Sequence, residues 1–117
     1  MHAVGRASKN APTFINLKYH GNPDSDKWVS FVGKGVCFDT GGLNIKPSIV
    51  FFNIASSIKD MYLDKSGAVS VFTAFKYVVK QKVKINLTAS MGFVENFLGS
   101  AAYRPADIIK SRKGITV

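Results

Sequence analysis

The chain has 117 residues, of which 46% are hydrophobic and 12% aromatic, as in one small globular domain. No apolar run of about 20 residues is long enough to span a bilayer, and the N-terminus lacks the apolar core of a secretory signal. Sixteen basic and seven acidic residues give a formal charge of +9. However, the lysines are scattered along the chain and lack the aromatic interleaving of an RNA-binding sheet. We therefore expect a solvated basic face, without nucleic-acid or membrane partners.

The first half of the sequence has two strand patterns. Residues 12–19 alternate between apolar and polar, and the turn-forming residues 20–24 follow them. Residues 28–32 are β-branched and aromatic, which predicts a buried strand. This strand leads through a glycine-rich stretch to Asp39, so polar chemistry follows an apolar strand, as in the sites of α/β folds.

The second half begins with a helical pattern. Residues 66–81 are apolar at helical spacing and nearly all round, which predicts a helix that is covered on more than one side. Residues 83–94 alternate again and predict a second core strand; residues 103–108 indicate a turn with a short helical start, and residues 115–117 the beginning of a strand. The order strand, helix, strand predicts an α/β fold, a partial mixed β-sheet flanked by helices.

Asp39 is the main candidate for a metal ligand, because hydrolytic metal sites need oxygen ligands from different segments. Gly41 and Gly42 follow it and allow a sharp turn that leaves room for a ligand. An equally good interpretation is a turn aspartate that accepts a hydrogen bond from its own backbone.

Three further residues have two interpretations each. Asp64 precedes the predicted helix, where an N-capping role is the simpler explanation. Lys34 and Lys46 lie on either side of Asp39, and Lys34 stands between two glycines, an unusual place for a residue that normally marks solvated surface. A neutral lysine amine can bind a metal ion, but the local pattern favours the simpler interpretation, in which both lysines are solvated surface residues.

Other catalytic arrangements have little support. His2 and His20 do not have the spacing of zinc ligands, and neither is placed to activate Cys37 as a nucleophile. A single cysteine excludes an internal disulfide and suits a reducing compartment, so we expect a cytoplasmic protein.

Residues 32–46 closely resemble the signature of the leucyl (cytosol) aminopeptidase family of metallopeptidases. Three later stretches follow in the family's order, namely residues 61–68, 94–96 and 102–109. The resemblance covers nearly the whole chain and implies that residues 1–117 are part of the catalytic domain of such an enzyme.

The resemblance also implies roles for individual residues. Lys34, Asp39 and Asp64 match metal ligands, with Asp39 bridging two ions, and Lys46 matches the lysine that polarises the scissile carbonyl. The cofactors would be two divalent ions, manganese or zinc, and the substrate a peptide with a free N-terminus. A homo-hexamer is typical of the family.

Two departures from the family's pattern affect this expectation. The family's next segment, Asn-Thr-Asp-Ala-Glu-Gly-Arg, supplies further ligands and is not in this sequence, so we expect incomplete metal coordination and weak or absent turnover. An apolar stretch near residues 48–56 replaces a shorter polar loop and is expected to be an insertion. The alternative is a catalytically inactive remnant that acts as a binding or structural module.

Overall fold

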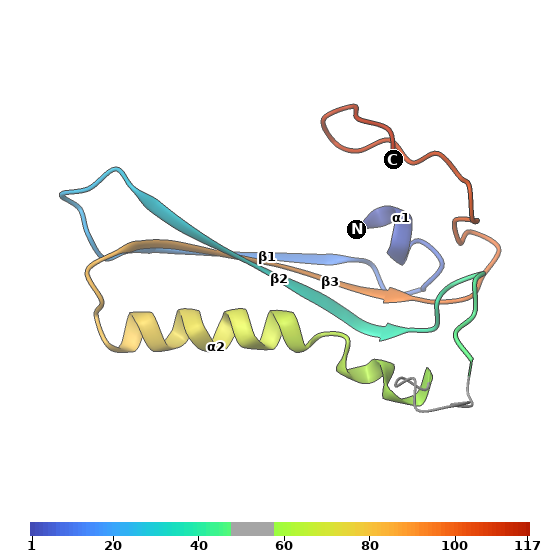
Figure 1. Ribbon diagram of the computed structural model, residues 1–117, viewed down its shortest axis with the longest axis horizontal. Helices are drawn as coiled ribbons and strands as arrows, with labels where there is room; N and C mark the ends of the chain where they lie inside the picture. Colours follow the sequence, from blue (N-terminus) through green and yellow to red (C-terminus); the bar gives the residue numbers. More distant parts are fainter. Residues whose placement is uncertain (48–57) are drawn as a thin grey trace.

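The computed structural model describes residues 1–47 and 58–117. The helices and strands are α1 (His2–Gly5), β1 (Thr13–His20), β2 (Trp28–Asp39), the 3-10 helix η1 (Ile58–Leu63), α2 (Ser66–Lys80) and β3 (Asn86–Asn96), as Figure 1 shows. The expected insertion at 48–56 lies outside the described residues.

The three strands form one mixed sheet in the order β1-β3-β2. β3 pairs antiparallel with β1 and parallel with β2. Parallel neighbours need a crossover connection, and η1 and α2 provide it. The predicted strand-helix-strand order and mixed sheet are therefore confirmed, and the carboxyl ends of β2 and β3 meet at the same edge of the sheet.

The core lies on β3, the central strand. Leu87 and Ala89 are fully buried, Met91 is 2% exposed, and Ala68 of α2 joins them. β3 begins at Asn86, three residues later than the pattern of residues 83–94 predicts. Its central position explains the burial, because it has a strand on each side and α2 against one face.

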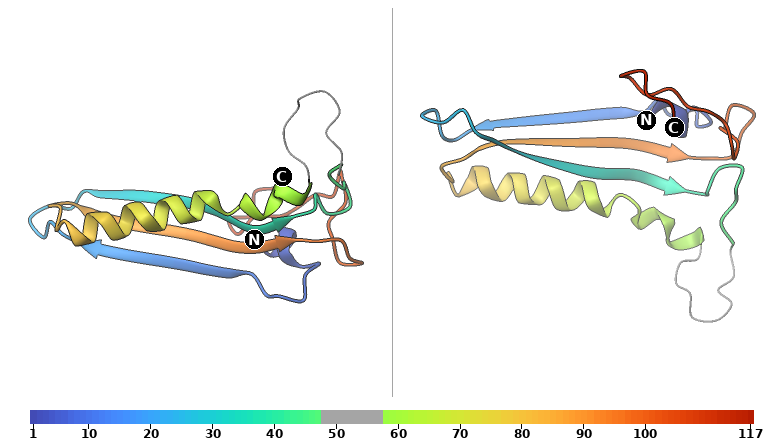
Figure 2. Two further views of the ribbon diagram at one scale, coloured as in Figure 1. Left: turned by 90° about the horizontal axis from the view of Figure 1, so that it is seen from below. Right: turned by 45° about the horizontal axis from the view of Figure 1, so that its top comes forward.

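The helices lie on both faces of the sheet: α2 on one, α1 and the C-terminal segment on the other (Figure 2). Close contact between β2 and α2 depends on Gly33, since a Cβ atom there would lie 2.7 Å from the Cα of Ala68. This contact brings the N-terminal end of α2, and the residues just before it, beside the second half of β2.

Two expectations about burial are wrong for this chain. The strand at residues 28–32 forms but is not buried, with Val32 80% exposed, because β2 is an edge strand. α2 is covered on one side only, and Phe72 and Tyr77 are 50% and 62% exposed. The radius of gyration, 17.4 Å, exceeds the value of about 13 Å for a compact chain of this length, so the sheet and its helices form an extended molecule.

The C-terminal segment is less regular than expected. Residues 103–108 contain a turn but no helix, and residues 115–117 form only an isolated bridge, from Lys110 to Thr116. Within residues 1–47 and 58–117, none of the helices combines the length and apolar character needed to cross a membrane.

Candidate metal centre at the carboxyl end of β2

Asp39 ends β2 and starts a tight turn. Its Oδ1 accepts a hydrogen bond of 2.9 Å from the backbone N–H of Gly41. Gly41 and Gly42 have φ values of +88° and +64°, which glycine adopts without strain. The interpretation of Asp39 as a turn residue is thus confirmed, and it does not exclude a second role, because other groups also bind this carboxylate.

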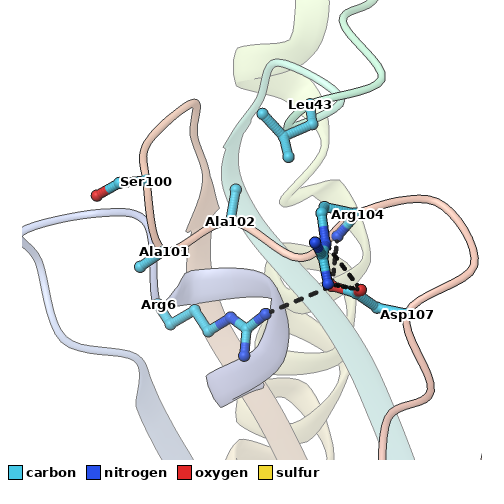
Figure 3. Close-up of a pocket in the computed structure, with 7 residues that line it drawn as sticks. All are labelled: Arg6, Leu43, Ser100, Ala101, Ala102, Arg104 and Asp107. Atoms are coloured by element: carbon cyan, nitrogen blue, oxygen red, sulfur yellow. Dashed lines mark hydrogen bonds and ion pairs between the residues drawn. The ribbon is translucent and has the colours of Figure 1, made fainter.

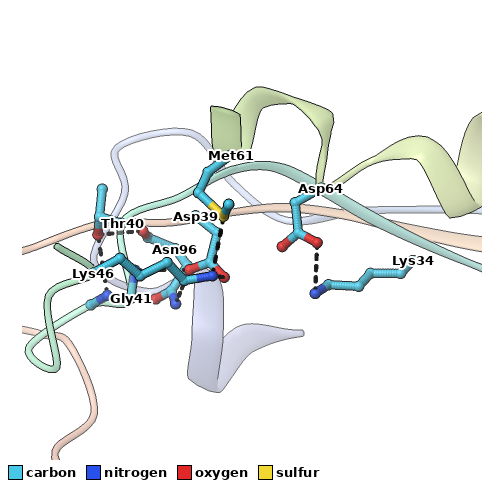
Figure 4. A network of polar contacts seen from close by, with 9 residues as sticks. Lys34, Asp39, Thr40, Gly41, Lys46, Met61, Asp64 and Asn96 are labelled. Atoms are coloured by element: carbon cyan, nitrogen blue, oxygen red, sulfur yellow. Dashed lines mark hydrogen bonds and ion pairs between the residues drawn. The ribbon is translucent and has the colours of Figure 1, made fainter. Parts of the chain in front are cut away.

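Lys46 folds back from the end of this turn onto Asp39 (Figure 4). Its Nζ lies 2.7 Å from Oδ2 of Asp39 and 3.2 Å from Sδ of Met61 in η1. The backbone N–H of Lys46 donates to the carbonyl oxygen of Thr40 at 2.8 Å, which fixes the start of its side chain. The spacing of seven residues between Asp39 and Lys46 therefore closes a loop in which the two charges meet.

The contacts of Asp39 keep it ionised. Burial of the carboxyl raises its pKa, but hydrogen bonds from Lys46, Gly41 and Asn96 and the charge of Lys46 outweigh that effect, so the pKa of Asp39 lies below its ordinary value. An ionised carboxylate is the form that binds a cation.

Lys34 and Asp64 form a second pair. Nζ of Lys34 lies 2.8 Å from Oδ1 of Asp64. The N-cap residue of α2 is Lys65, which makes no side-chain capping bond, and the hydroxyl of Ser66 donates to the carbonyl oxygen of Leu63. The expectation that Asp64 caps this helix is therefore wrong: the Asp64 carboxylate points to β2.

A β-bulge puts Lys34 and Asp39 on the same face of β2. Residues five apart on a regular strand point to opposite faces. Here the register shifts at Cys37, which has no partner in the described ladder, so that Lys34 pairs with Gly92 and Asp39 with Asn96. Because Gly92 and Asn96 are four residues apart on β3, their partners on β2 share a face.

Asn96 is a site residue without a predicted role. It ends β3 directly beside Asp39, and its Nδ2 donates to Oδ1 of Asp39 at 2.7 Å. A polar residue at the end of a buried strand is the signal in the sequence, but only parallel pairing of β3 with β2 brings it to Asp39.

A divalent cation fits the donors at this edge of the sheet. Oδ2 of Asp64 is buried and has no hydrogen-bond partner among the described residues. Buried carboxylate oxygens are normally paired, so this atom has capacity for a ligand. Asp39 and Asp64 could hold a metal ion together with the amine of Lys34. The described residues contain no group of three or more His, Cys, Asp and Glu side chains with metal-binding geometry, so any such site here uses lysine or further ligands.

His20 and Cys37 take part in other contacts. The ring of His20 stacks on Trp28 with centroids 5.5 Å apart, and Nζ of Lys18 lies 4.5 Å from the Trp28 centroid. His20 is opposite Asn86, at the other end of β3 from Asn96. The thiol of Cys37 donates a hydrogen bond of 3.7 Å to the carbonyl oxygen of Gly35.

A separate cleft of about 410 Å³ lies by the C-terminal segment (Figure 3). Two arginines line this cleft, and both contact Asp107. The backbone N–H and the guanidinium of Arg104 donate to the Asp107 carboxylate at 2.8–3.0 Å. The guanidinium of Arg6, in the segment after α1, lies 3.9 Å from the same carboxylate. The backbone hydrogen bond from Arg104 is the main reason why the pKa of Asp107 lies below its ordinary value. This cluster ties residues 103–109 to the N-terminal segment.

Comparison with known proteins gives a consistent result. A model of the cytosol aminopeptidase family, catalytic domain, matches residues 1–117. The chain is 42% identical over 116 residues to a probable cytosol aminopeptidase of Vibrio parahaemolyticus, covering 98% of this chain and 22% of that protein. It therefore spans about a fifth of the length of the curated relatives that it matches.

Solved structures give the same fold. The chain superposes on leucyl aminopeptidase from Trypanosoma brucei in complex with bestatin with a TM-score of 0.86 and 36% identity, covering 99% of this chain and 21% of that one. It also superposes on the bottromycin maturation enzyme BotP in complex with Mn, with a TM-score of 0.81 and 32% identity, covering 97% of this chain and 23% of that one.

Proposed function

Because the chain belongs to the cytosol aminopeptidase family, we propose that it supplies part of a metal-dependent centre that removes N-terminal residues from peptides. The activity is a proposal for this chain, since it spans only about a fifth of its curated relatives. The substrate would be a peptide with a free N-terminus.

The observation that carries this proposal is the buried Oδ2 of Asp64, which has no hydrogen-bond partner among the described residues, in the carboxylate that pairs with Lys34. Lys34, Asp39 and Asp64 are the residues that would hold the two ions, and Asp39 would be the ligand common to both. Each carboxylate is paired with a lysine ammonium, which balances its charge locally. Lys34 would bind an ion only as the neutral amine, after its proton has passed to solvent, because an ammonium has no lone pair. With a cation bound at Asp39, Lys46 would no longer be the group that balances this carboxylate.

Lys46 would then bind the substrate. Divalent ions in such centres acidify a bound water and stabilise the charge that develops on the scissile carbonyl. The ammonium of Lys46, held near Asp39 and Met61, would donate to the carbonyl oxygen as it gains negative charge. The ions would be manganese or zinc; the similar BotP structure is described with Mn.

Location and assembly are proposed here from the family resemblance. We propose a cytoplasmic protein, as the names of its relatives indicate. A homo-hexamer is what the resemblance implies, but no described contact of this chain supports it.

The experiment is calorimetric titration of the purified chain with Mn²⁺ and Zn²⁺. We expect weak but saturable binding, because three ligands do not fill the shells of two ions. Asp39→Asn and Asp64→Asn should each weaken binding at least tenfold. Asp24→Asn, which changes an exposed carboxylate paired with Lys84, is the control and should leave binding unchanged.

Absence of binding, or binding that neither site variant weakens, would overturn the assignment. Hydrolysis of leucine amide by the 117-residue chain should be weak or absent for the same reason of incomplete coordination. Robust, Mn²⁺-stimulated release of leucine would show that these residues suffice and that the incomplete-site expectation is wrong.

A further inference from the structure

Asn96 is one of two buried polar residues in the described core, at 8% exposure. Burying an amide costs free energy unless its groups are hydrogen-bonded. Its Nδ2 donates to Oδ1 of Asp39 at 2.7 Å (Figure 4). The same Oδ1 accepts from the backbone of Gly41, so two N–H donors occupy one oxygen of the carboxylate.

The backbone of Asn96 also holds the turn after Asp39. Its carbonyl oxygen accepts from the N–H of Thr40 at 3.0 Å and from the Thr40 hydroxyl at 2.7 Å. Its side-chain oxygen leaves little space at Gly42, where a Cβ atom would lie 3.0 Å away. One residue of the central strand thus contacts both the Asp39 carboxylate and the turn that leads to Lys46.

These contacts have a geometric consequence. With Oδ1 held by two donors, the carboxylate of Asp39 cannot rotate freely, and Oδ2 is the oxygen turned to Lys46. Asn96 donates from a neutral amide at this position, so it fixes the carboxylate without adding a charge.

We propose that Asn96 is a positioning residue that orients the Asp39 carboxylate toward the metal ion. This inference rests on the function proposed above. Asn96 does not touch the substrate or the ion; it acts through Asp39. Residues that hydrogen-bond to metal ligands typically change metal affinity about 10- to 100-fold when they are replaced.

The test compares Asn96→Ala and Asn96→Asp with a matched control, Asn86→Ala. Asn86 is also a buried asparagine of β3, at 1% exposure, but it lies at the other end of the strand and donates to the carbonyls of Asn22 and Ser25. Three quantities are measured on each 117-residue chain: the folded fraction by circular dichroism, the Mn²⁺ affinity by calorimetry, and the pKa of Asp39 by NMR without metal.

We expect both Asn96 variants to bind Mn²⁺ at least tenfold more weakly. Asn96→Ala should raise the pKa of Asp39 toward its ordinary value, and Asn96→Asp should raise it further, because a second carboxylate repels the first. Asn86→Ala should lose stability with neither effect. Asn96→Asp preserves the side-chain volume, so its Mn²⁺ affinity tests the inference if Asn96→Ala does not fold.

Unchanged Mn²⁺ affinity and an unchanged Asp39 pKa in a folded Asn96 variant would overturn this inference and leave the proposed function standing. Equal losses of affinity in the Asn86 and Asn96 variants would do the same, since they would reveal general destabilisation. A wild-type chain without Mn²⁺ affinity would overturn the proposed function, and the inference with it.

Discussion

Lys34 binds Asp64 through only one of its carboxylate oxygens: Nζ lies 2.8 Å from Oδ1, while Oδ2 is buried without a partner in the described structure. The pair joins β2 to the residue just before the N-cap of α2. The lysine side chain is 62% exposed, so solvent screens the pair, and the contact contributes little to stability. The arrangement suits a ligand site better than a structural ion pair.

Asp64→Asn should therefore separate stability from metal binding. We expect the free energy of unfolding to fall by no more than about 1 kcal/mol, because screened ion pairs contribute that little. Urea denaturation measures it, with Asp24→Asn as the control for an exposed pair. A loss of more than about 3 kcal/mol, the size of a broken buried pair, would show that Asp64 is structural instead.

Gly41→Ala tests the turn that joins Asp39 to Lys46. Gly41 and Gly114 both have positive φ, +88° and +84°, so alanine should cost about 1–2 kcal/mol of unfolding free energy at either position. At Gly41 the new Cβ would also clash with the carbonyl oxygen of Asn44, whereas the nearest atom at Gly114 is 3.8 Å away. We expect the larger loss, and weaker Mn²⁺ binding, for Gly41→Ala alone. Equal losses of stability in the two variants would contradict the packing argument.

Glu95 should contribute to acid sensitivity. Hydrogen bonds from Ser8 and Asn10 to its Oε2 hold the pKa of Glu95 below its ordinary value of 4.5. A lowered folded-state pKa stabilises the fold above the unfolded pKa, and that contribution is lost as pH falls through the folded one. In Glu95→Gln, the free energy of unfolding should fall less steeply below about pH 4.5 than in the wild type. Ser8→Ala should give an intermediate slope, and parallel curves for all three chains would argue against this account.

The exposed apolar side of β2 should make the chain associate. An unpaired edge strand with exposed apolar side chains favours pairing between molecules. Val32→Lys places a charge on this strand, where Val32 is 80% exposed, and should reduce association in sedimentation velocity runs without loss of stability. Val117→Lys changes an equally exposed valine away from the sheet, at 84%, and should leave association unchanged. If both variants reduced it equally, net charge and not the strand edge would be responsible.

Local patterns determined the elements of this fold. The alternation in residues 12–19 and 83–94 and the helical spacing in 66–81 correspond to β1, β3 and α2, because hydrophobic periodicity reflects which side of an element meets the core. The same patterns did not predict how deeply each element is buried, because burial depends on which neighbouring elements are present. The apolar residues of β2 and α2 predict two-sided cover, but β2 is an edge strand, and Val32 and Phe72 are exposed.

The sequence by itself determined the family resemblance and the candidates Lys34, Asp39, Lys46 and Asp64, since the glycine-rich signature and its spacing are local. Only the tertiary structure decided how they are arranged. The bulge at Cys37 determines the face of β2 on which Asp39 lies. The close contact of β2 with α2 makes Asp64 a partner of Lys34, where the sequence favours a helix cap. Parallel pairing of β3 with β2 brings in Asn96, whose role no local pattern indicates, because the contact spans 57 residues of chain.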